Sequence, residues 1–530
     1  MQLTEKGIIE ERGAWEAAGY RLPQYDHAAM VKATRENPTW IHFGNGNIFR
    51  AFQANVAQEL LNDGTLDRGI IAVGGHEAME KLNHPHDNLT VLVTLKADGT
   101  MEKTIVGSVA ESLTLDAGYD ADFERIKEIF TKDSLQMASF TITEKGYSLT
   151  RVDGSYLEEV EADLKNGPAA PKNYMAKIAA FLYARYQAGA KPVSLVSMDN
   201  CSHNGTKLQE AVLTFAKAWG EEGFVEYVSN PEKVGFPWSM IDKITPRPDS
   251  AVEAVLEKDG IADLKPIITA KKTYIAPFVN AEEAQYLVIA DEFPNGRPAL
   301  EKGGVIFTER ETVDKVEKMK VCTCLNPLHT ALAVFGCLLG FDKISSEMKD
   351  ATLKKMVEEI GYTEGLPVVV NPGVLDPKEF IDTVINVRLP NPFMPDTPQR
   401  IATDTSQKLA VRSGETVKAY AASETLQVSE LVRIPLVYAG WLRYLMAVDD
   451  NGNAMELSPD PLLDSVCPYV ADIKLGETNE VEAAVRPILE NAQIFGVNLY
   501  EVGLAPLVCR YFQEMIAGPG AVRATLEKYI

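Results

Sequence analysis

The sequence predicts an α/β fold, in which an N-terminal Rossmann-type doubly wound sheet is followed by a mainly α-helical C-terminal domain. Between about residues 40 and 200, β-rich apolar runs alternate with helical patterns, which favours a parallel sheet built from βαβ units. The first of these runs ends in a Gly-x-Gly turn. Beyond about residue 300, strand-like runs thin out and helical patterns dominate. We therefore predict two domains, over residues 1–300 and 301–530.

The composition narrows the classes of function. Hydrophobic residues make up 46% of the chain and charged residues 24%, as in ordinary soluble globular proteins. The net charge of -23 argues against nucleic acid or an anionic membrane as a partner, and an anionic substrate would need a local basic pocket. The longest apolar run, 330–341, is too short to span a bilayer. The charged N-terminus lacks the apolar core of a signal peptide.

The cysteines indicate a reducing compartment and no metal site. They are scattered along the chain and do not form a disulfide framework. Cys322 and Cys324 are too close together for the usual zinc hairpin, and no His/Cys partner set follows at ligand spacing. We therefore predict a cytoplasmic protein without a metal, and nothing in the sequence indicates its oligomeric state.

A strand–turn–helix pattern at residues 40–63 predicts a dinucleotide site. Residues 40–43 form a short apolar run, Gly44 and Gly46 allow a tight turn, and residues 49–63 have an amphipathic helical pattern. In dinucleotide folds the helix N–H groups after such a turn meet a pyrophosphate. Phe49 stands at the third glycine of the usual fingerprint, so a purely structural turn would explain the pattern equally well.

Five residues are the predicted cofactor contacts. The turn and the first helical turn supply four of them, with Arg50 as a cation for the phosphates. A carboxylate after the second strand, residues 69–75, supplies a hydrogen-bond acceptor for an adenosine ribose, although it lies further from the turn than is usual. They are Gly44, Gly46, Asn47, Arg50 and Glu77. No basic cluster follows the second strand to hold a 2′-phosphate, so we predict NAD rather than NADP.

Two later segments place polar residues beside the predicted sheet. Residues 89–95 and 103–109 straddle an Ala-Asp-Gly turn and predict a hairpin. Asn200 follows the predicted strand 192–198, and ligands bind just beyond the carboxyl ends of such strands. An Asx-rich turn that caps the next helix would explain Asn200 as well. Asp242 follows an apolar residue, Ile241, in a proline-bounded loop.

The stretch 318–340 brings an amine, an amide and an imidazole close together along the chain. Pro327 fits the first position of a buried helix that ends at Gly340, and Asn326 fits its N-cap. A second helix, residues 312–325, precedes it. Lys320, Asn326 and His329 at this junction can move a proton on and off an alcohol oxygen. A solvated lysine, a helix cap and a core histidine are the structural alternatives.

Nine segments, in the same order, resemble the polyol-specific long-chain dehydrogenases, the mannitol dehydrogenase family. They are HFGNGNIFRAFQ (42–53), TITEKGY (141–147), SMDNCSHNG (197–205), FPWSMIDKITP (236–246), YLVIADEFPNGRPALEKGGVIF (286–307), KVCTCLNPLHTAL (320–332), RLPNPFMPDT (388–397), DTSQK (404–408) and AGWLRYL (439–445). The resemblance implies an NAD(P)-dependent, metal-free oxidoreductase. The implied catalytic residues are Lys320, Asn326, His329 and Asn200, and the implied substrate contacts include Asp242 and Arg388.

The chain departs from the family pattern in three places. The family has four residues between its lysine and asparagine, whereas five separate Lys320 from Asn326, which leaves Lys318 as a lesser alternative. Phe49 replaces a histidine. Asn326 is followed by Pro-Leu instead of small residues.

The expected reaction is hydride transfer at a secondary-alcohol carbon of an acyclic sugar derivative, with Lys320 moving the proton. A hexuronate needs a cationic partner, and Arg388 and Lys408 are available. We therefore expect the pair D-mannonate and D-fructuronate. Mannitol and fructose are the alternative, together with other polyols or tagaturonate. A different class remains open, namely a dinucleotide-binding redox sensor without turnover.

Overall fold

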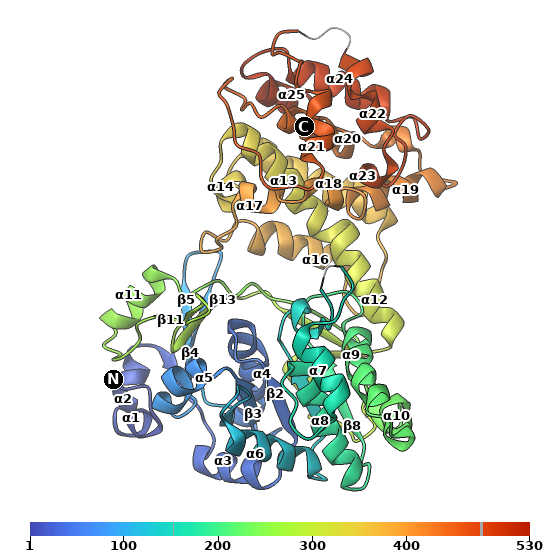
Figure 1. Cartoon of the computed structure of the whole chain (residues 1–530). Helices are drawn as coiled ribbons and strands as arrows, with labels where there is room; N and C mark the ends of the chain where they lie inside the picture. Colours follow the sequence, from blue (N-terminus) through green and yellow to red (C-terminus); the bar gives the residue numbers. More distant parts are fainter. Residues whose placement is uncertain (152, 478–480) are drawn as a thin grey trace. The chain divides into compact units, whose positions relative to one another are not determined.

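The computed structural model describes residues 1–151, 153–477 and 481–530, and the chain divides into two compact units (Figure 1). Unit 1 contains Met1–Leu95 and Thr100–Asp314, and unit 2 contains Lys96–Gly99 and Lys315–Ile530. The main division falls after Asp314 rather than after residue 300, because strand β15 (Ile306–Thr308) still pairs with strand β14 (Tyr286–Ala290) of unit 1.

The main sheet of unit 1 has six parallel strands. They are β6 (Val109–Thr114), β3 (Ile70–Gly74), β2 (Trp40–Phe43), β7 (Met137–Phe140), β8 (Val193–Ser197) and β9 (Val234–Gly235), in this spatial order. Counted along the chain, the order is 3-2-1-4-5-6, which is that of a doubly wound dinucleotide fold. The order reverses between β2 and β7, and the predicted fold class is confirmed.

Helices cover both faces of this sheet because its side chains alternate between two apolar cores. Ile41 and Phe43 of β2 belong to the core shared with α6 (Asp120–Thr131), α8 (Tyr174–Gln187) and α9 (Asn204–Ala218). Trp40, on the other face, belongs to the core shared with α4 (Ala54–Asn62). Strands of four or five residues that are buried on both faces explain why the runs in the sequence are almost purely apolar.

The predicted hairpin exists, but its second run belongs to two sheets. Strand β4 (Thr90–Leu95) pairs antiparallel with β5 (Met101–Val106) in a four-stranded sheet with β1 (Tyr20–Arg21) and β13 (Phe278–Glu282). After Val106 the chain enters β6 of the main sheet. The apolar run 103–109 therefore spans the end of one strand and the start of another. In the smaller sheets, β14 pairs with β10 (Ser239–Asp242) on one side and β15 on the other, and β11 (Ile267–Ile268) pairs with β12 (Tyr274–Ile275).

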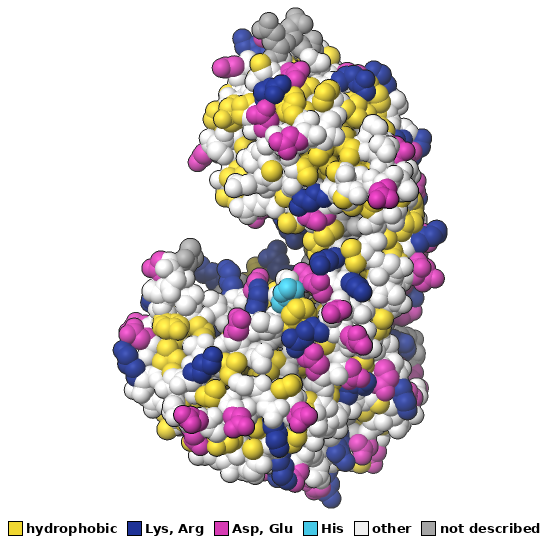
Figure 2. Space-filling view, turned by 90° about the vertical axis from the view of Figure 1, so that its right-hand side faces the viewer, with side chains coloured by type: hydrophobic (Ala, Val, Ile, Leu, Met, Phe, Trp, Pro, Cys, Tyr) yellow, Lys and Arg dark blue, Asp and Glu magenta, His cyan; other side chains and the backbone are white. Residues whose placement is uncertain are grey.

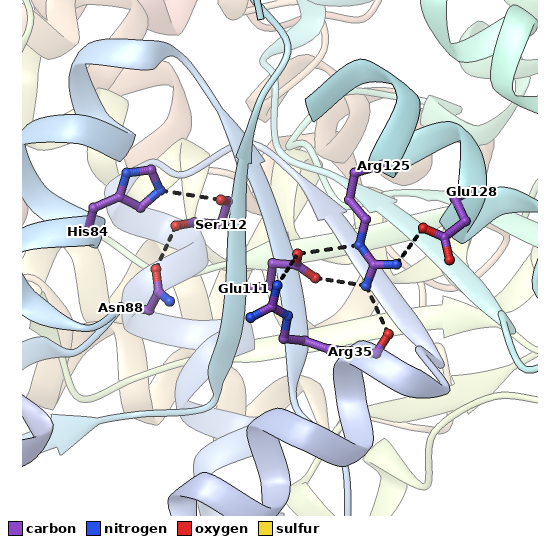
Figure 3. A network of polar contacts seen from close by, with 7 residues as sticks. All are labelled: Arg35, His84, Asn88, Glu111, Ser112, Arg125 and Glu128. Atoms are coloured by element: carbon purple, nitrogen blue, oxygen red, sulfur yellow. Dashed lines mark hydrogen bonds and ion pairs between the residues drawn. The ribbon is translucent and has the colours of Figure 1, made fainter. Parts of the chain in front are cut away.

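A polar network holds the edge strand β6 (Figure 3). Arg125 binds both carboxylate oxygen atoms of Glu111, at 3.3 and 3.0 Å, and also contacts Glu128. On the neighbouring residue, the Ser112 hydroxyl donates to the Asn88 side chain at 2.6 Å. A bidentate arginine–carboxylate pair restrains geometry more than a single ion pair does. The network therefore positions the strand that leads into residues 115–120.

Unit 2 contains helix α13 (Asn326–Leu339), labelled in Figure 1. Most of its side chains are buried in the core of the unit. The helix packs against α17 (Pro398–Ala402) and α20 (Arg433–Leu445), and α20 packs against α24 (Ala505–Met515). The other longer helices of the unit are α15 (Ala351–Glu358), α16 (Pro377–Thr383), α19 (Ser413–Ala422), α22 (Val481–Leu489) and α25 (Ala521–Tyr529).

The structure confirms the predicted C-terminal end of α13 but not its predicted N-cap. Gly340 ends the helix with φ +77°, a conformation that suits glycine. Pro327 lies in the first turn, but the N-cap is Leu325, with φ -127° and ψ -59°, and no side chain caps the helix. The prediction that Asn326 is the N-cap is therefore wrong, because the residue before the proline already has a helical position and Leu325 makes the bend.

A π-helical turn, η6 (Met319–Cys324), joins α12 (Arg310–Lys318) to α13. Its hydrogen bonding includes Leu325 N to Lys320 O at 3.1 Å, which spans five residues instead of four. The run Arg310–Leu339 is long and apolar enough, by length and composition, to cross a membrane, but 78% of its apolar window is buried inside the structure. That burial is typical of a core helix.

On the face shown in Figure 2, acidic and basic side chains are interspersed. The net charge of -23 is therefore not gathered into a single acidic patch on this face.

Candidate functional site

A cavity of about 950 Å³ lies at the carboxyl edge of the main sheet in unit 1. Its walls come from the segments that follow four strands: Gly44 and Asn45 after β2, Gly74–Gly75 after β3, 115–120 after β6, and Thr141–Ile142 after β7. The cavity thus lies where the strand order reverses, the position at which doubly wound sheets bind ligands. Its volume is at the upper end of the roughly 300–1,000 Å³ typical of ligand sites.

The glycine turn leaves room for a ligand to approach the backbone. Gly44 has φ +119°, and a Cβ atom there would lie 2.3 Å from the carbonyl oxygen of Thr141. At Gly46 an added Cβ would meet nothing within 4 Å. The helix begins directly afterwards, since Arg50 N donates to Gly46 O at 3.2 Å. Open space beside unpaired helix N–H groups fits the pyrophosphate of a dinucleotide.

Three of the predicted cofactor contacts are engaged elsewhere. Arg50 is buried and donates to the Ala276 carbonyl at 2.7 Å and to Asn47 Oδ1 at 3.1 Å, and the Asn47 amide donates to a further carbonyl. Burial lowers the pKa of Arg50 to about 10. Glu77 pairs with Lys81 at 3.0 Å and accepts from Ala270 N at 2.9 Å. None of the three lines the cavity, and neither does Gly46, whereas Gly44 does.

The carboxylate that does line the cavity is Asp116, which follows β6. Its Oδ2 accepts from the backbone N–H of His76 at 2.7 Å and lies 2.8 Å from the imidazole Nδ1. The cavity wall also contains Lys172, Lys177 and Lys271. The sequence prediction missed this acid and these lysines because none of them lies in the strand–turn–helix segment 40–63 or directly after the second strand.

A second buried carboxylate organises the loop after β7. Asp199 accepts from the Tyr147 hydroxyl at 2.5 Å and from the backbone N–H groups of Ile142 and Thr143 at 3.0 and 2.8 Å. Burial raises the pKa of this carboxyl group. The Tyr147 hydroxyl also lies 2.8 Å from Ser197 Oγ at the end of β8. The network ties the cavity wall to the strand end that carries Asn200, which is exposed in unit 1.

In unit 2, the two candidate lysines differ in how far their side chains are buried. Lys320, in the π-helical turn η6, has 5% of its surface exposed, whereas Lys318 is exposed. The π-helical turn includes Lys320 and ends before Asn326, and a turn closed by a bond across five residues holds one residue more than an α-helical turn. The assignment of Lys320 as the counterpart of the family's lysine stays a prediction.

Asn326 and His329 lie in the first turn of α13, close to several cations. Asn326 makes no capping bond through its side chain. His329 Nε2 lies 3.5 Å from Asp396 Oδ2. Burial lowers the pKa of His329; Asp396 raises it, and Arg412, Arg388 and Arg400 lower it in turn. The imidazole therefore favours its neutral form in a locally positive field, although the chain as a whole carries a net charge of -23.

The remaining predicted substrate contacts are divided between the units. Arg388 is buried at the end of the π-helical turn η9 (Val384–Arg388) in unit 2. Lys408, also in unit 2, donates to the carbonyl groups of Ile401 and Thr403. Asp242 ends strand β10 in unit 1. The sequence prediction assigned no role to Arg412, which no local pattern marks, or to Asp396, although Asp396 lies in the segment 388–397 that resembles the family.

Comparison with known proteins defines the class. Residues 38–302 match the mannitol dehydrogenase Rossmann domain, and residues 312–508 match the mannitol dehydrogenase C-terminal domain. The chain belongs to the mannitol dehydrogenase family and is an oxidoreductase.

Particular relatives narrow the comparison further. The chain is 53% identical over 529 residues to the D-mannonate oxidoreductase of Thermotoga maritima, with 98% of each chain covered. It is 29% identical to the D-mannonate oxidoreductase of Escherichia coli, over 83% of this chain and 85% of that one. Among solved structures, the ternary complex of Pseudomonas fluorescens mannitol 2-dehydrogenase with NAD and D-mannitol has a TM-score of 0.68 and 26% identity, covering 100% of this chain and 99% of the other.

Proposed function

We propose that this protein is an NAD-dependent dehydrogenase that interconverts D-mannonate and D-fructuronate. The single observation that carries the proposal is the concentration of cations around His329 in unit 2, where Arg388, Arg400 and Arg412 all act on the imidazole. A sugar acid needs such a field to offset the net charge of the chain, whereas a neutral polyol does not. The full-length similarity to a D-mannonate oxidoreductase supports the same substrate.

Each catalytic residue has a defined role in the proposed reaction. In reduction the Lys320 ammonium group donates a proton to the ketone oxygen, and in oxidation the neutral amine accepts it from the alcohol. The amide groups of Asn326 and Asn200 donate hydrogen bonds to that oxygen atom as negative charge develops on it. Such donors contribute about 3 kcal/mol each in other enzymes. Neutral His329, Asp242, Arg388 and Lys408 orient the substrate hydroxyl and carboxylate groups.

The cavity of unit 1 is the proposed dinucleotide site. The bound nicotinamide dinucleotide supplies the hydride for reduction and accepts it in oxidation. Gly44 and Gly46 admit the pyrophosphate, and the three lysines of the wall offset its charge. We propose NAD over NADP because the Asp116 carboxylate in the same wall opposes a 2′-phosphate. The reaction as proposed requires no metal, and the proposed location is the cytoplasm.

A substrate panel tests the proposal. The purified protein is assayed with NAD and NADP on D-mannonate, D-mannitol and D-tagaturonate or its reduced form, in both directions. We expect the highest kcat/KM with D-mannonate and NAD. A clear preference for D-mannitol would favour the polyol alternative, and cofactor binding without turnover of any substrate would favour the redox sensor.

A further inference from the structure

We propose that Arg412 binds the carboxylate of the substrate and thereby selects sugar acids over polyols. The inference rests on the proposed function, because it names the residue in the basic cluster that recognises the acid group. Neither the predicted motifs nor the assigned roles of Arg388 and Lys408 include this residue.

The first observation is the position of Arg412. It directly precedes α19, and its side chain reaches the first turns of α13. Nη1 donates to the Thr330 hydroxyl at 2.5 Å and lies 3.4 Å from the Asn326 carbonyl oxygen. Thr330 is the neighbour of His329. The guanidinium group is therefore held against the same helical turn that presents the proposed amide and imidazole groups.

The second observation is the absence of a counter-ion. Among the described residues, no carboxylate pairs with Arg412. Three other arginines of unit 2 have such a partner: Arg400 pairs with Asp396, Arg433 with Glu359, and Arg523 with Asp350. Arg443 has no carboxylate partner within the described residues either, but its guanidinium group donates to three backbone carbonyl groups through all three nitrogen atoms. Arg412 is half-buried, and that burial lowers its pKa to about 10, so it remains charged near neutral pH. A cation that is partly removed from water without an acid partner is matched by an anionic ligand.

The third observation is that the Nε–Nη2 edge of the Arg412 guanidinium group is available to bind a ligand. A guanidinium group has five N–H donors, and the hydrogen bonds of Arg412 use only Nη1. Within the described part of the chain, Nε and Nη2 have no hydrogen-bond partner, yet neither is sealed from solvent. These two nitrogen atoms form the fork that binds a carboxylate through two parallel hydrogen bonds. By contrast, Lys408 Nζ already donates to two carbonyl oxygen atoms.

Together these observations separate two tasks within the cluster. Asn326 and His329 act on the oxygen atoms near the reacting carbon, and the available edge of Arg412 lies beside the same turn of α13. An aldonate presents a carboxylate at the end of its chain, where mannitol has a neutral hydroxymethyl group. Arg412 therefore distinguishes the two substrate classes by charge and by the planar fork geometry.

The test compares substrates that differ in this group alone. The variants Arg412→Gln and Arg412→Lys, and the wild type, are assayed with NAD on D-mannonate, its neutral amide D-mannonamide, and D-mannitol. Where a compound is not turned over, its inhibition constant against D-mannonate replaces kcat/KM. We expect Arg412→Gln to lower kcat/KM for D-mannonate at least about 30-fold, the low end for loss of one partner of a buried hydrogen-bonded charge pair. The neutral compounds should change less than about 3-fold, which corresponds to about 0.6 kcal/mol.

Two further measurements distinguish recognition from a structural role. Arg412→Lys keeps the charge but loses the fork, so it should recover part of the D-mannonate activity. Arg486→Gln removes a charge from unit 2 outside this cluster, from a side chain that is 49% exposed and paired with Glu490, and it should spare the ratio of acid to neutral substrate. Thermal unfolding of each variant shows whether the fold is retained.

The possible results distinguish a failure of this inference from a failure of the proposed function. If the wild type uses D-mannonate but Arg412→Gln weakens acid and neutral compounds equally, Arg412 only supports α13 and the inference is overturned. If Arg412→Gln does not fold, the Arg412→Lys variant decides by the same ratio of acid to neutral substrate. If the wild type prefers D-mannitol, the proposed function itself fails.

Discussion

The two units build their candidate sites from different parts of the chain. The cavity of unit 1 is shaped by segments at the ends of four parallel strands, with Gly44 in its wall and open space beside Gly46 in the same turn. The basic cluster of unit 2 is made of long side chains from separate helical segments around α13. A backbone site binds the invariant part of a ligand through N–H groups that every residue carries. A side-chain site can change its specificity by single substitutions.

Mutations in the two units should therefore affect different properties of the protein. Changes that fill the backbone cavity should alter cofactor affinity for every substrate. Changes in the basic cluster should alter substrate choice or the chemical step while cofactor affinity is kept.

The largest effect is expected at Lys320, in unit 2. Lys320→Ala should lower kcat at least about 10²-fold, the low end for general acid–base catalysis. Lys318→Ala is the matched control, because this lysine is only two residues away but exposed, and it should change kcat little. Steady-state kinetics of both variants, with the pH profile of oxidation, provide the measurement. If Lys318→Ala is inactive while Lys320→Ala stays active, Lys318 and not Lys320 is the residue that moves the proton.

Gly46→Ala tests the backbone site of unit 1. An added Cβ at Gly46 meets no protein atom within 4 Å, so the melting temperature of the free protein should be unchanged or slightly higher. The dissociation constant for NAD, measured by fluorescence titration, should rise about 10-fold, or about 1.4 kcal/mol. Unchanged NAD affinity would show that the cofactor does not approach this turn. Gly44→Ala should instead lower stability, since its Cβ collides with Thr141.

Asp116→Asn tests whether a carboxylate in the cavity wall determines the preference for NAD over NADP. Loss of this carboxylate should raise the ratio of NADP to NAD in kcat/KM at least about 5-fold, or about 1 kcal/mol. Glu77→Gln is the control, because Glu77 pairs with Lys81 outside the cavity and should leave the ratio unchanged. A shift in the Glu77 variant alone would restore the ribose contact predicted from the sequence.

A pH-dependent effect is expected at His42, in the sheet of unit 1. Burial lowers its pKa to about 3, while its ring nitrogen atoms lie 2.6 Å from Ser139 Oγ and 2.9 Å from Thr141 Oγ1. The unfolded chain binds a proton here below about pH 6.5, whereas the folded chain does not, so stability falls as the pH falls from that value. The slope is at most about 1.4 kcal/mol per pH unit.

The measurement is chemical unfolding of the wild type and of His42→Gln between pH 7.5 and pH 4. The difference in stability between the two proteins should shrink as the medium becomes more acidic. A difference that stays constant over this range would contradict a neutral buried imidazole. His76→Gln, at a half-exposed histidine, serves as the control.

The smallest effect, none at all, is expected on removal of metals. Among residues 1–151, 153–477 and 481–530, no group of three or more His, Cys, Asp and Glu side chains is placed to hold an ion. Activity should therefore survive exhaustive treatment with EDTA. Loss of activity that zinc or manganese restores would overturn the metal-free reaction in both units.

The sequence by itself determined the features that depend on neighbours along the chain. Apolar runs of four or five residues predict buried parallel strands, and the strand–glycine–helix pattern predicts the turn at 44–46. Gly340 ends α13 as expected, because a left-handed φ at a helix end has a strong local preference. The family motifs also identified Lys320, Asn326 and His329 as candidates, since these three residues lie within ten residues of one another in the sequence.

Only the tertiary structure decided which charged groups have partners. Arg50 and Glu77 fit a cofactor site by sequence position, yet their hydrogen bonds go to Ala276 and Ala270, more than 190 residues away. Asp116 is in the cavity wall because β6 lies beside β3, and Arg412 matters because it reaches Thr330. A side-chain hydrogen bond depends on distances in space, and sequence separation carries no information about them once the chain has folded.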